Sequence, residues 1–257
     1  PGRESAAIGR RRFRNPAKCV AAGQPPQSGA VYQGVYGPWK VESSDVREVV
    51  LYRSGLVTAA SSFVIASSVA FFRNSNLEVL DLIGRNLDLL YGLGACGLGL
   101  SLYLIHIYVT EIKRALQALW LIGVIGSISA YAALAQPESK SLVEYVVENR
   151  TAVLFVGPIF AALTGLVFKE GLCYGKLEAG ALTFIIPILL LGHLTGLMSE
   201  GTELSLLALW MGLFVVFAGR KFSQPIKDDI GDKSIFIFNA LPEEEKSELI
   251  RRLEELK

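Results

Sequence analysis

A cluster of charged or reactive side chains lies between Phe168 and Glu178, next to a long apolar run, and four of them are candidate site residues: Lys169, Glu170, Cys173 and Glu178. A lysine beside a thiol favours the thiolate, which is the nucleophilic form of cysteine. Nucleophilic catalysis also needs a base, and this stretch contains no histidine. The four residues therefore predict a docking surface for a partner protein more than an active site, and they favour a role outside catalysis.

The chain has two histidines, His106 and His193, and both fall within apolar stretches. A histidine inside a membrane can ligate a haem or a chlorophyll, or carry a proton. Neither histidine has an acidic residue at helical spacing, and a hydrogen bond between helices would satisfy each ring. We predict no cofactor and no metal, with ligation through His106 or His193 as the alternative.

Two other patterns have ordinary structural explanations. Gly92 to Gly97 matches the dinucleotide-binding fingerprint, but it lies within an apolar run and not between a strand and a helix, so packing explains it better. Asp81 and Asp88 lie where a solvated helix would begin. The apolar runs hold no acid or base at mid-depth, which argues against an ion-coupled transporter.

These residues must be positioned by a membrane domain. The chain has 257 residues, of which 51% are hydrophobic and 19% charged, and this composition is too apolar for an ordinary soluble domain. A net charge of +1 argues against nucleic-acid binding. The three cysteines are too far apart to suggest a disulfide framework or a metal site: Cys19, Cys96 and Cys173.

About six runs are long enough to cross a hydrocarbon core of about 30 Å as helices, since helices satisfy their own backbone groups in lipid. They are Ser54 to Phe72, Leu87 to Val109, Ala115 to Ala135, Thr151 to Phe168, Ala179 to Met198 and Leu204 to Gly219. Small residues four apart, such as Gly192 and Gly196, allow close helix contacts. The predicted fold is all-α: a polytopic transmembrane bundle over residues 54–219, with short soluble segments at both ends.

Lysine and arginine gather in the loops on one side of this bundle, which predicts that both termini face a matrix-like compartment. Residues 1–22 are rich in arginine and poor in acids and have no apolar core, as in an organelle transit peptide. We therefore predict that residues 23–53 lie in the stroma. A hairpin is expected near Tyr32 to Val41, and Asp45 is expected as a helix N-cap. Trp39, Tyr52 and Arg53 should anchor at the lipid headgroups.

Residues 220–257 form a second soluble segment, also predicted to be stromal. Ser234 to Phe238 could add a strand beside the hairpin. After Pro242, a helix is expected with an ion pair between Glu248 and Arg252 and with an apolar stripe formed by Leu249, Ile250, Leu253 and Leu256. Its polar face is too acidic for a membrane-surface helix, so we expect it to bind a partner or to pack on its own chain.

The chain from about Val31 onward resembles a family of cyanobacterial and plastid integral membrane proteins of unknown function. The similar stretches are Val31 to Gly34 with Tyr36 to Pro38, Val49 to Leu56, Phe168 to Glu170 with Cys173, and Leu190 to Leu194. The resemblance implies a chloroplast membrane, in the thylakoid or the inner envelope. It implies no activity and no catalytic residue.

The sequence thus favours a non-enzymatic accessory, assembly or scaffold component of a chloroplast membrane complex. Its expected partners are the lipid bilayer and a membrane complex contacted from the stromal side. Two alternatives are a small-molecule channel or carrier, suggested by the glycine-rich second and fifth runs with His106 and His193, and a pigment or haem protein ligated by histidine.

Overall fold

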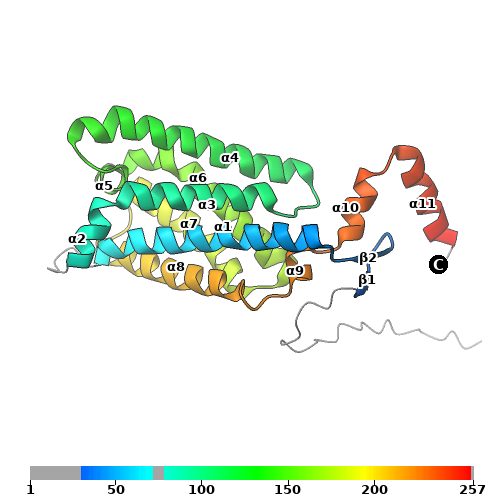
Figure 1. The fold of residues 1–257 in the computed structure, drawn as a ribbon. Helices are drawn as coiled ribbons and strands as arrows, with labels where there is room; N and C mark the ends of the chain where they lie inside the picture. Colours follow the sequence, from blue (N-terminus) through cyan, green and yellow to red (C-terminus); the bar gives the residue numbers. More distant parts are fainter. Residues whose placement is uncertain (1–29, 72–77, 256–257) are drawn as a thin grey trace, which may run out of the picture.

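The computed structural model describes residues 30–71 and 78–255, and six helices in this part are long and apolar enough to cross a membrane. Figure 1 shows these helices lying side by side in one bundle. They are α1 (Ser43–Ser68), α3 (Leu87–Leu104), α4 (Thr110–Ala130), α6 (Val153–Tyr174), α7 (Leu177–Thr195) and α8 (Glu200–Arg220). The predicted all-α transmembrane bundle is therefore confirmed.

Short elements connect or extend the spans. They are β1 (Val31–Gln33), β2 (Pro38–Lys40), η1 (Val69–Phe71), α2 (Glu78–Arg85), η2 (Tyr131–Ala135, a π-helix), η3 (Gln136–Glu138), α5 (Leu142–Glu148), η4 (Arg150–Ala152), α9 (Ile226–Ile230), α10 (Lys233–Ala240) and α11 (Glu243–Glu255). The second span ends earlier than predicted, because Ile105 adopts an extended conformation. His106 consequently lies beyond α3, in the connection to α4, and not within a span.

Close contacts between helix backbones hold the bundle together. A Cβ added to Gly97 of α3 would lie 2.6 Å from the carbonyl oxygen of Gly55 on α1, and one added to Gly123 of α4 would lie 2.5 Å from the nitrogen of Ile159 on α6. Gly94, also in the fingerprint-like stretch, faces the ring of Phe63. Gly94 and Gly97 therefore serve helix packing, as small residues commonly do in membranes, whereas a Cβ added to Gly92 would meet nothing within 4 Å.

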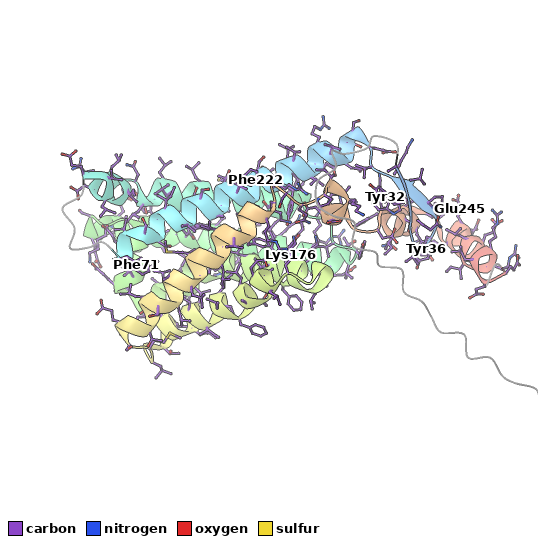
Figure 2. The ribbon with its side chains drawn as sticks, turned by 90° about the horizontal axis from the view of Figure 1, so that it is seen from below. Tyr32, Tyr36, Phe71, Lys176, Phe222 and Glu245 are labelled. Carbon is purple, nitrogen blue, oxygen red and sulfur yellow. The ribbon has the colours of Figure 1, made fainter. Side chains whose placement is uncertain are left out.

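The hairpin β1–β2 and helices α10 and α11 lie together at one end of the bundle, and we call them the head (Figure 1). Helices α2 and α5 lie at the opposite end. Figure 2 shows this separation, with Phe71 at the far end, Lys176 near the head and Tyr36 within it. The predicted hairpin is confirmed, since Tyr32 pairs with Trp39 in an antiparallel ladder.

Two local predictions are wrong. The N-cap of α1 is Glu42, and Asp45 is the third helical residue, whose carboxylate accepts a hydrogen bond from the Glu42 nitrogen at 2.8 Å. The capping box thus forms one turn earlier than expected. Residues 234–238 form helix and not strand, because Asp232 caps α10 by accepting from the Ser234 nitrogen.

The head nevertheless brings together the two segments that we predicted to be neighbours, the hairpin and residues 234–238. Asp232 accepts a hydrogen bond from the backbone nitrogen of Val35 at 2.7 Å, and the rings of Tyr36 and Phe238 stack at 3.8 Å. Burial alone would raise the pKa of Asp232, but hydrogen bonds from Ser234 and Val35 outweigh it and hold that pKa below its usual value. The ionised carboxylate is therefore what joins the hairpin to α10.

Candidate functional site

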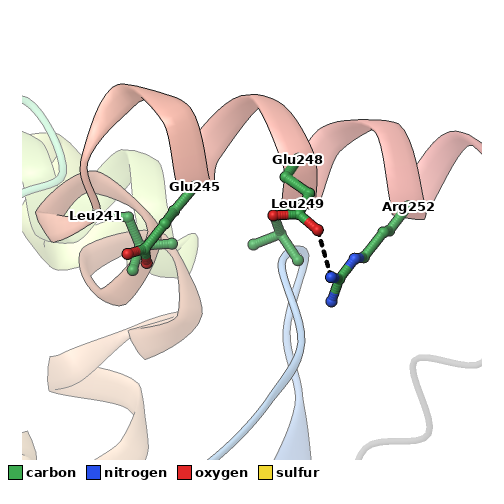
Figure 3. Close-up of a pocket in the computed structure, with 5 residues that line it drawn as sticks. All are labelled: Leu241, Glu245, Glu248, Leu249 and Arg252. Carbon is green, nitrogen blue, oxygen red and sulfur yellow. Dashed lines mark hydrogen bonds and ion pairs between the residues drawn. The ribbon is translucent and has the colours of Figure 1, made fainter.

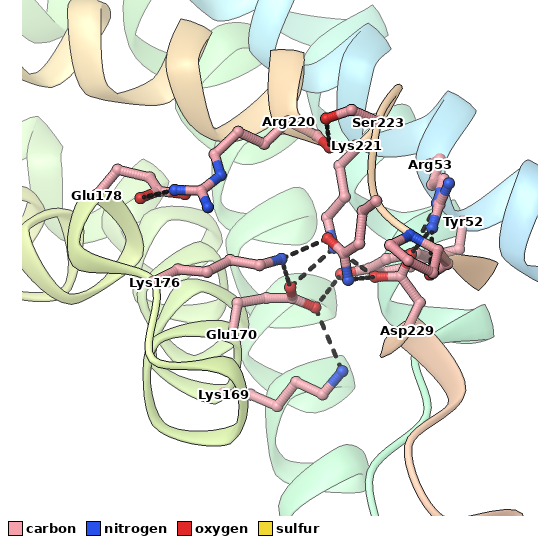
Figure 4. A network of polar contacts seen from close by, with 12 residues as sticks. Tyr52, Arg53, Lys169, Glu170, Lys176, Glu178, Arg220, Lys221, Ser223 and Asp229 are labelled. Carbon is pink, nitrogen blue, oxygen red and sulfur yellow. Dashed lines mark hydrogen bonds and ion pairs between the residues drawn. The ribbon is translucent and has the colours of Figure 1, made fainter. Parts of the chain in front are cut away.

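A buried ionic network lies where the bundle meets the head (Figure 4). At its centre is Glu170 of α6, whose side chain is 0% exposed. Its Oε2 accepts from the Nζ of Lys176 at 2.7 Å and of Lys221 at 2.8 Å, and the Nζ of Lys169 lies 3.3 Å from its Oε1. Charges removed from water need such pairing, because an isolated buried ion is very costly.

A second buried carboxylate, Asp229 of α9, extends the network. Its Oδ1 accepts from Lys221 Nζ at 2.5 Å, and its Oδ2 accepts from Arg53 Nε at 2.7 Å. Gln224 links the two halves, since it accepts from Lys176 and donates to Asp229. The network therefore ties α1, α6 and α8 to α9, which leads directly into the head.

The side chains of Tyr52 and Arg53 belong to this network and not to the lipid headgroup layer. Tyr52 is 2% exposed and its hydroxyl donates to Glu170 Oε1 at 3.1 Å. The prediction that these two residues anchor the helix in the headgroups is wrong, because buried carboxylates attract both side chains inward. Tyr52 and Arg53 thus donate hydrogen bonds to buried carboxylates that water cannot reach.

Glu178 forms a separate pair at the start of α7. Its Oε2 accepts from Arg220 Nη1 at 2.9 Å, while its buried Oε1 has no hydrogen-bond partner in the described part of the chain. Glu170 and Glu178 both point into the protein. A docking surface near Lys169 and Cys173 would therefore have to be formed by side chains other than these two carboxylates; the side chain of Cys173 lies outside the described structure.

Burial shifts the pKa of two residues at the edge of the network, Lys176 and Asp228. The pKa of Lys176 is lowered by desolvation, although Glu170 opposes the shift by stabilising the ammonium. The pKa of Asp228 is raised, again mainly by burial. Both shifts disfavour the charged form and show that the network lies in a poorly hydrated place, where its ion pairs can hold the helices together.

The two histidines lie near opposite ends of the bundle. The Nε2 of His106 is 3.6 Å from an oxygen of Glu48, and burial lowers the pKa of His106 while Glu48 opposes that shift. The Nδ1 of His193 lies 2.6 Å from Glu203 Oε1, and its Nε2 lies 3.0 Å from the carbonyl oxygen of Val146. Cofactor ligation by either histidine remains a prediction, and at His193 it would require breaking one of these contacts.

The sequence pointed to Lys169, Glu170 and Glu178 as site residues but not to Lys221, which pairs with Glu170, or to Asp229, which pairs with Lys221. Lys221 and Asp229 carried one usable signal: each is a charge within ten residues of the end of the last apolar run, on the same side as Glu170. In residues 30–71 and 78–255, no group of three or more histidine, cysteine, aspartate or glutamate side chains is placed to hold a metal ion.

A six-span helical bundle closed at one end by buried ion pairs defines a polytopic integral membrane protein. Residues 100–238 match the family described as "Uncharacterized integral membrane protein (DUF2301)", and the chain belongs to this family. The matched part runs from α3 to α10 and includes Glu170, Lys221 and Asp229. No curated protein and no solved structure matches the chain.

Proposed function

We propose that this protein is a non-enzymatic accessory component of a membrane complex, acting in its assembly or as a scaffold, and that it binds its partner through α11. The observation that carries the proposal is the position of α11, which extends away from the bundle (Figure 1). None of its described residues is buried. Such a helix offers a surface that the described part of this chain leaves uncovered.

The sequence of α11 suits a docking helix. Leu249 and Leu253 lie four residues apart on one face, and Ile250 beside them is 42% exposed. Isolated helices of this length are marginal in water. Ion pairs such as Arg252 with Glu248 support it only weakly, so a partner that covered its apolar face would stabilise it.

The charge of the surface indicates the chemistry of the partner. A shallow hollow is lined by the apolar side chains of Leu241 and Leu249, by Glu245 and Glu248, and by Arg252, which pairs with Glu248 (Figure 3). The first turn of α11 adds Glu243 and further acids. We infer that the partner is a protein presenting a basic amphipathic helix. The apolar face of such a helix would contact the leucines of the hollow, and its basic face would lie beside the acids of α11.

The test is purification of the tagged protein from native membranes in mild detergent, followed by mass spectrometry. The wild-type protein should elute with a partner in a fixed ratio, and the double variant Leu249→Asp and Leu253→Asp should lose it. Arg251→Ala, on an exposed part of the same helix, is the matched control and should retain it. Recovery of the wild-type monomer alone would overturn the proposal.

We also propose that the membrane is a chloroplast membrane, with both termini in the stroma. Support comes from the basic leader in residues 1–22, which lies outside the described residues, and from the lysines and arginines at the head end. An even number of spans puts the two ends of the bundle domain on one side. Import into isolated chloroplasts, followed by protease treatment of thylakoids and envelope, would test the location and orientation.

No described contact favours the carrier or the pigment alternative over the accessory role. The glycines that suggested a permeable bundle are used in packing: Gly97 against Gly55, and Gly192 against Met198. Solute flux into liposomes would test a carrier, and the absorption spectrum of protein from native membranes would test a bound haem or chlorophyll.

A further inference from the structure

Three elements meet at one histidine at the end of the bundle opposite the head. His193 belongs to the last turn of α7, Glu203 to the first turn of α8, and the carbonyl oxygen of Val146 to the short helix α5. The two contacts are 2.6 Å from His193 Nδ1 to Glu203 and 3.0 Å from Nε2 to Val146. His193 thus links α5 to the membrane-spanning helices α7 and α8.

The number of protons in this arrangement follows from its donors and acceptors. A carbonyl oxygen can only accept a hydrogen bond, so Nε2 must carry a proton. An ionised carboxylate also only accepts, so with Glu203 ionised Nδ1 must carry a proton as well; otherwise Glu203 itself must be protonated. Either way, the pair holds two protons. A neutral imidazole beside an ionised Glu203 has one proton and cannot satisfy both contacts.

We propose that His193 and Glu203 form a proton-binding site that fastens α5 to the bundle. With two protons bound, both contacts form and α5 is held. With one proton, the ring must give up either the carbonyl of Val146 or the carboxylate of Glu203, and α5 is released at its C-terminal end. The attachment is therefore strengthened by acid and weakened as the pH rises in the compartment opposite the head.

Other charged groups on the surrounding elements set the conditions at this site. They are Glu200 on α8, Glu144 and Glu148 on α5, Arg150 in η4, Asp88 on α3, and Lys140, which pairs with Glu138 and Glu148. In α6 the first ionisable residue is Lys169, near the other end of that helix. Acids outnumber bases among these groups.

A second attachment keeps α5 in place at its other end. Asp88 Oδ1 accepts a hydrogen bond from the backbone nitrogen of Leu142 at 2.8 Å. Glu144 and Ser141 form a capping box at the same end of the helix. Loss of the proton at His193 should consequently loosen the part of α5 around Val146 while the part around Leu142 stays bound.

The first experiment counts protons directly. His106→Gln leaves His193 as the one histidine of the chain, so that ¹⁵N-histidine labelling of the protein in lipid nanodiscs gives a single ring to follow by NMR. Infrared spectra of the same samples report whether Glu203 is protonated, with Glu203→Gln used for assignment. Over a titration from about pH 4 to 9, the expected change is from two protons on the pair to one.

The second experiment measures the release of α5 by hydrogen exchange. Amides near Val146 should exchange about tenfold faster after the proton is lost, which is the effect of one hydrogen bond. Glu203→Gln should abolish this pH step, since a glutamine amide can donate to Nδ1 of a neutral ring. Glu200→Gln, on the same turn of α8, removes a carboxylate that His193 does not contact and should retain the step.

Two results would overturn the proposal. One is a neutral His193 beside an ionised Glu203 under conditions in which α5 is still protected from exchange. The other is an unchanged pH step in folded Glu203→Gln protein. Neither result bears on the docking role of α11, which is tested separately by co-purification.

Discussion

The two ends of the bundle solve the same problem, polar groups beside lipid, in different ways. At the head end, Arg53, Lys169, Lys176 and Lys221 surround two buried carboxylates, Glu170 and Asp229. At the opposite end, one imidazole and one carboxylate share their contacts with a backbone carbonyl. The first arrangement is made of fixed charges, and the second depends on a mobile proton. The head end is therefore suited to a permanent attachment between helices, and the opposite end to an attachment that changes with pH.

Removing the central carboxylate should have the largest effect. Glu170→Gln leaves Lys169, Lys176 and Lys221 close together without the negative charge that they share. We expect a loss of about 3–5 kcal/mol in the free energy of unfolding, as for other broken buried ion pairs. Unfolding by SDS in mixed micelles measures it.

The control for this variant is Glu178→Gln. The partner of Glu178 is Arg220, whose side chain is 55% exposed and regains water when the pair is lost. The free energy of unfolding should then change by less than about 1 kcal/mol. Equal losses in the two variants would show that Glu170 is not the centre of the network.

Asp229→Asn should have the next largest effect on stability, and the loss should be greatest in α9 and the head. Asparagine keeps an acceptor but loses the charge that pairs with Arg53 and Lys221. The expected loss is about 2–3 kcal/mol, because Lys221 retains Glu170. Hydrogen exchange should rise in α9 and α10 and stay unchanged in α5; a uniform rise along the chain would contradict a local clasp.

A smaller loss of stability is expected for Gly196→Ala, at the end of the bundle that holds His193 and Glu203. Gly196 ends α7 with φ = 65°, and an added Cβ would clash with the guanidinium of Arg150. The left-handed backbone strain costs an alanine about 1 kcal/mol, and Arg150 must move as well. Thermal unfolding in detergent measures the loss. Gly201→Ala, where nothing lies within 4 Å of the added atom, should have almost no effect.

The smallest effect is a pH dependence of the head itself. Because the pKa of Asp232 is lower in the folded protein, its contribution is fully present above the unfolded value of about 4 and is lost as the pH falls through the folded value. Exchange at Val35 should therefore rise in strong acid. This direction is opposite to that expected for α5, and Asp232→Asn should remove it.

The bundle could be predicted from the sequence because apolar length alone determines it. The hairpin and the acidic amphipathic helix were also predictable, since turn residues and helical spacing are local signals. The contacts of Glu170 were not, because its partners come from α1, α7, α8 and the preceding residue. The pairing of His193 with Glu203 could not be predicted from helical spacing, because the two residues are ten positions apart and lie on consecutive helices.

The hydrogen bond from Val35 to Asp232 joins residues 197 positions apart. During synthesis the hairpin leaves the ribosome first, while its partner in α10 emerges only after the last span. The head can therefore form only after α10, which follows all six of these spans in the chain. A chain truncated after α8 would keep the hairpin but lose Asp232, to which the hairpin is hydrogen-bonded.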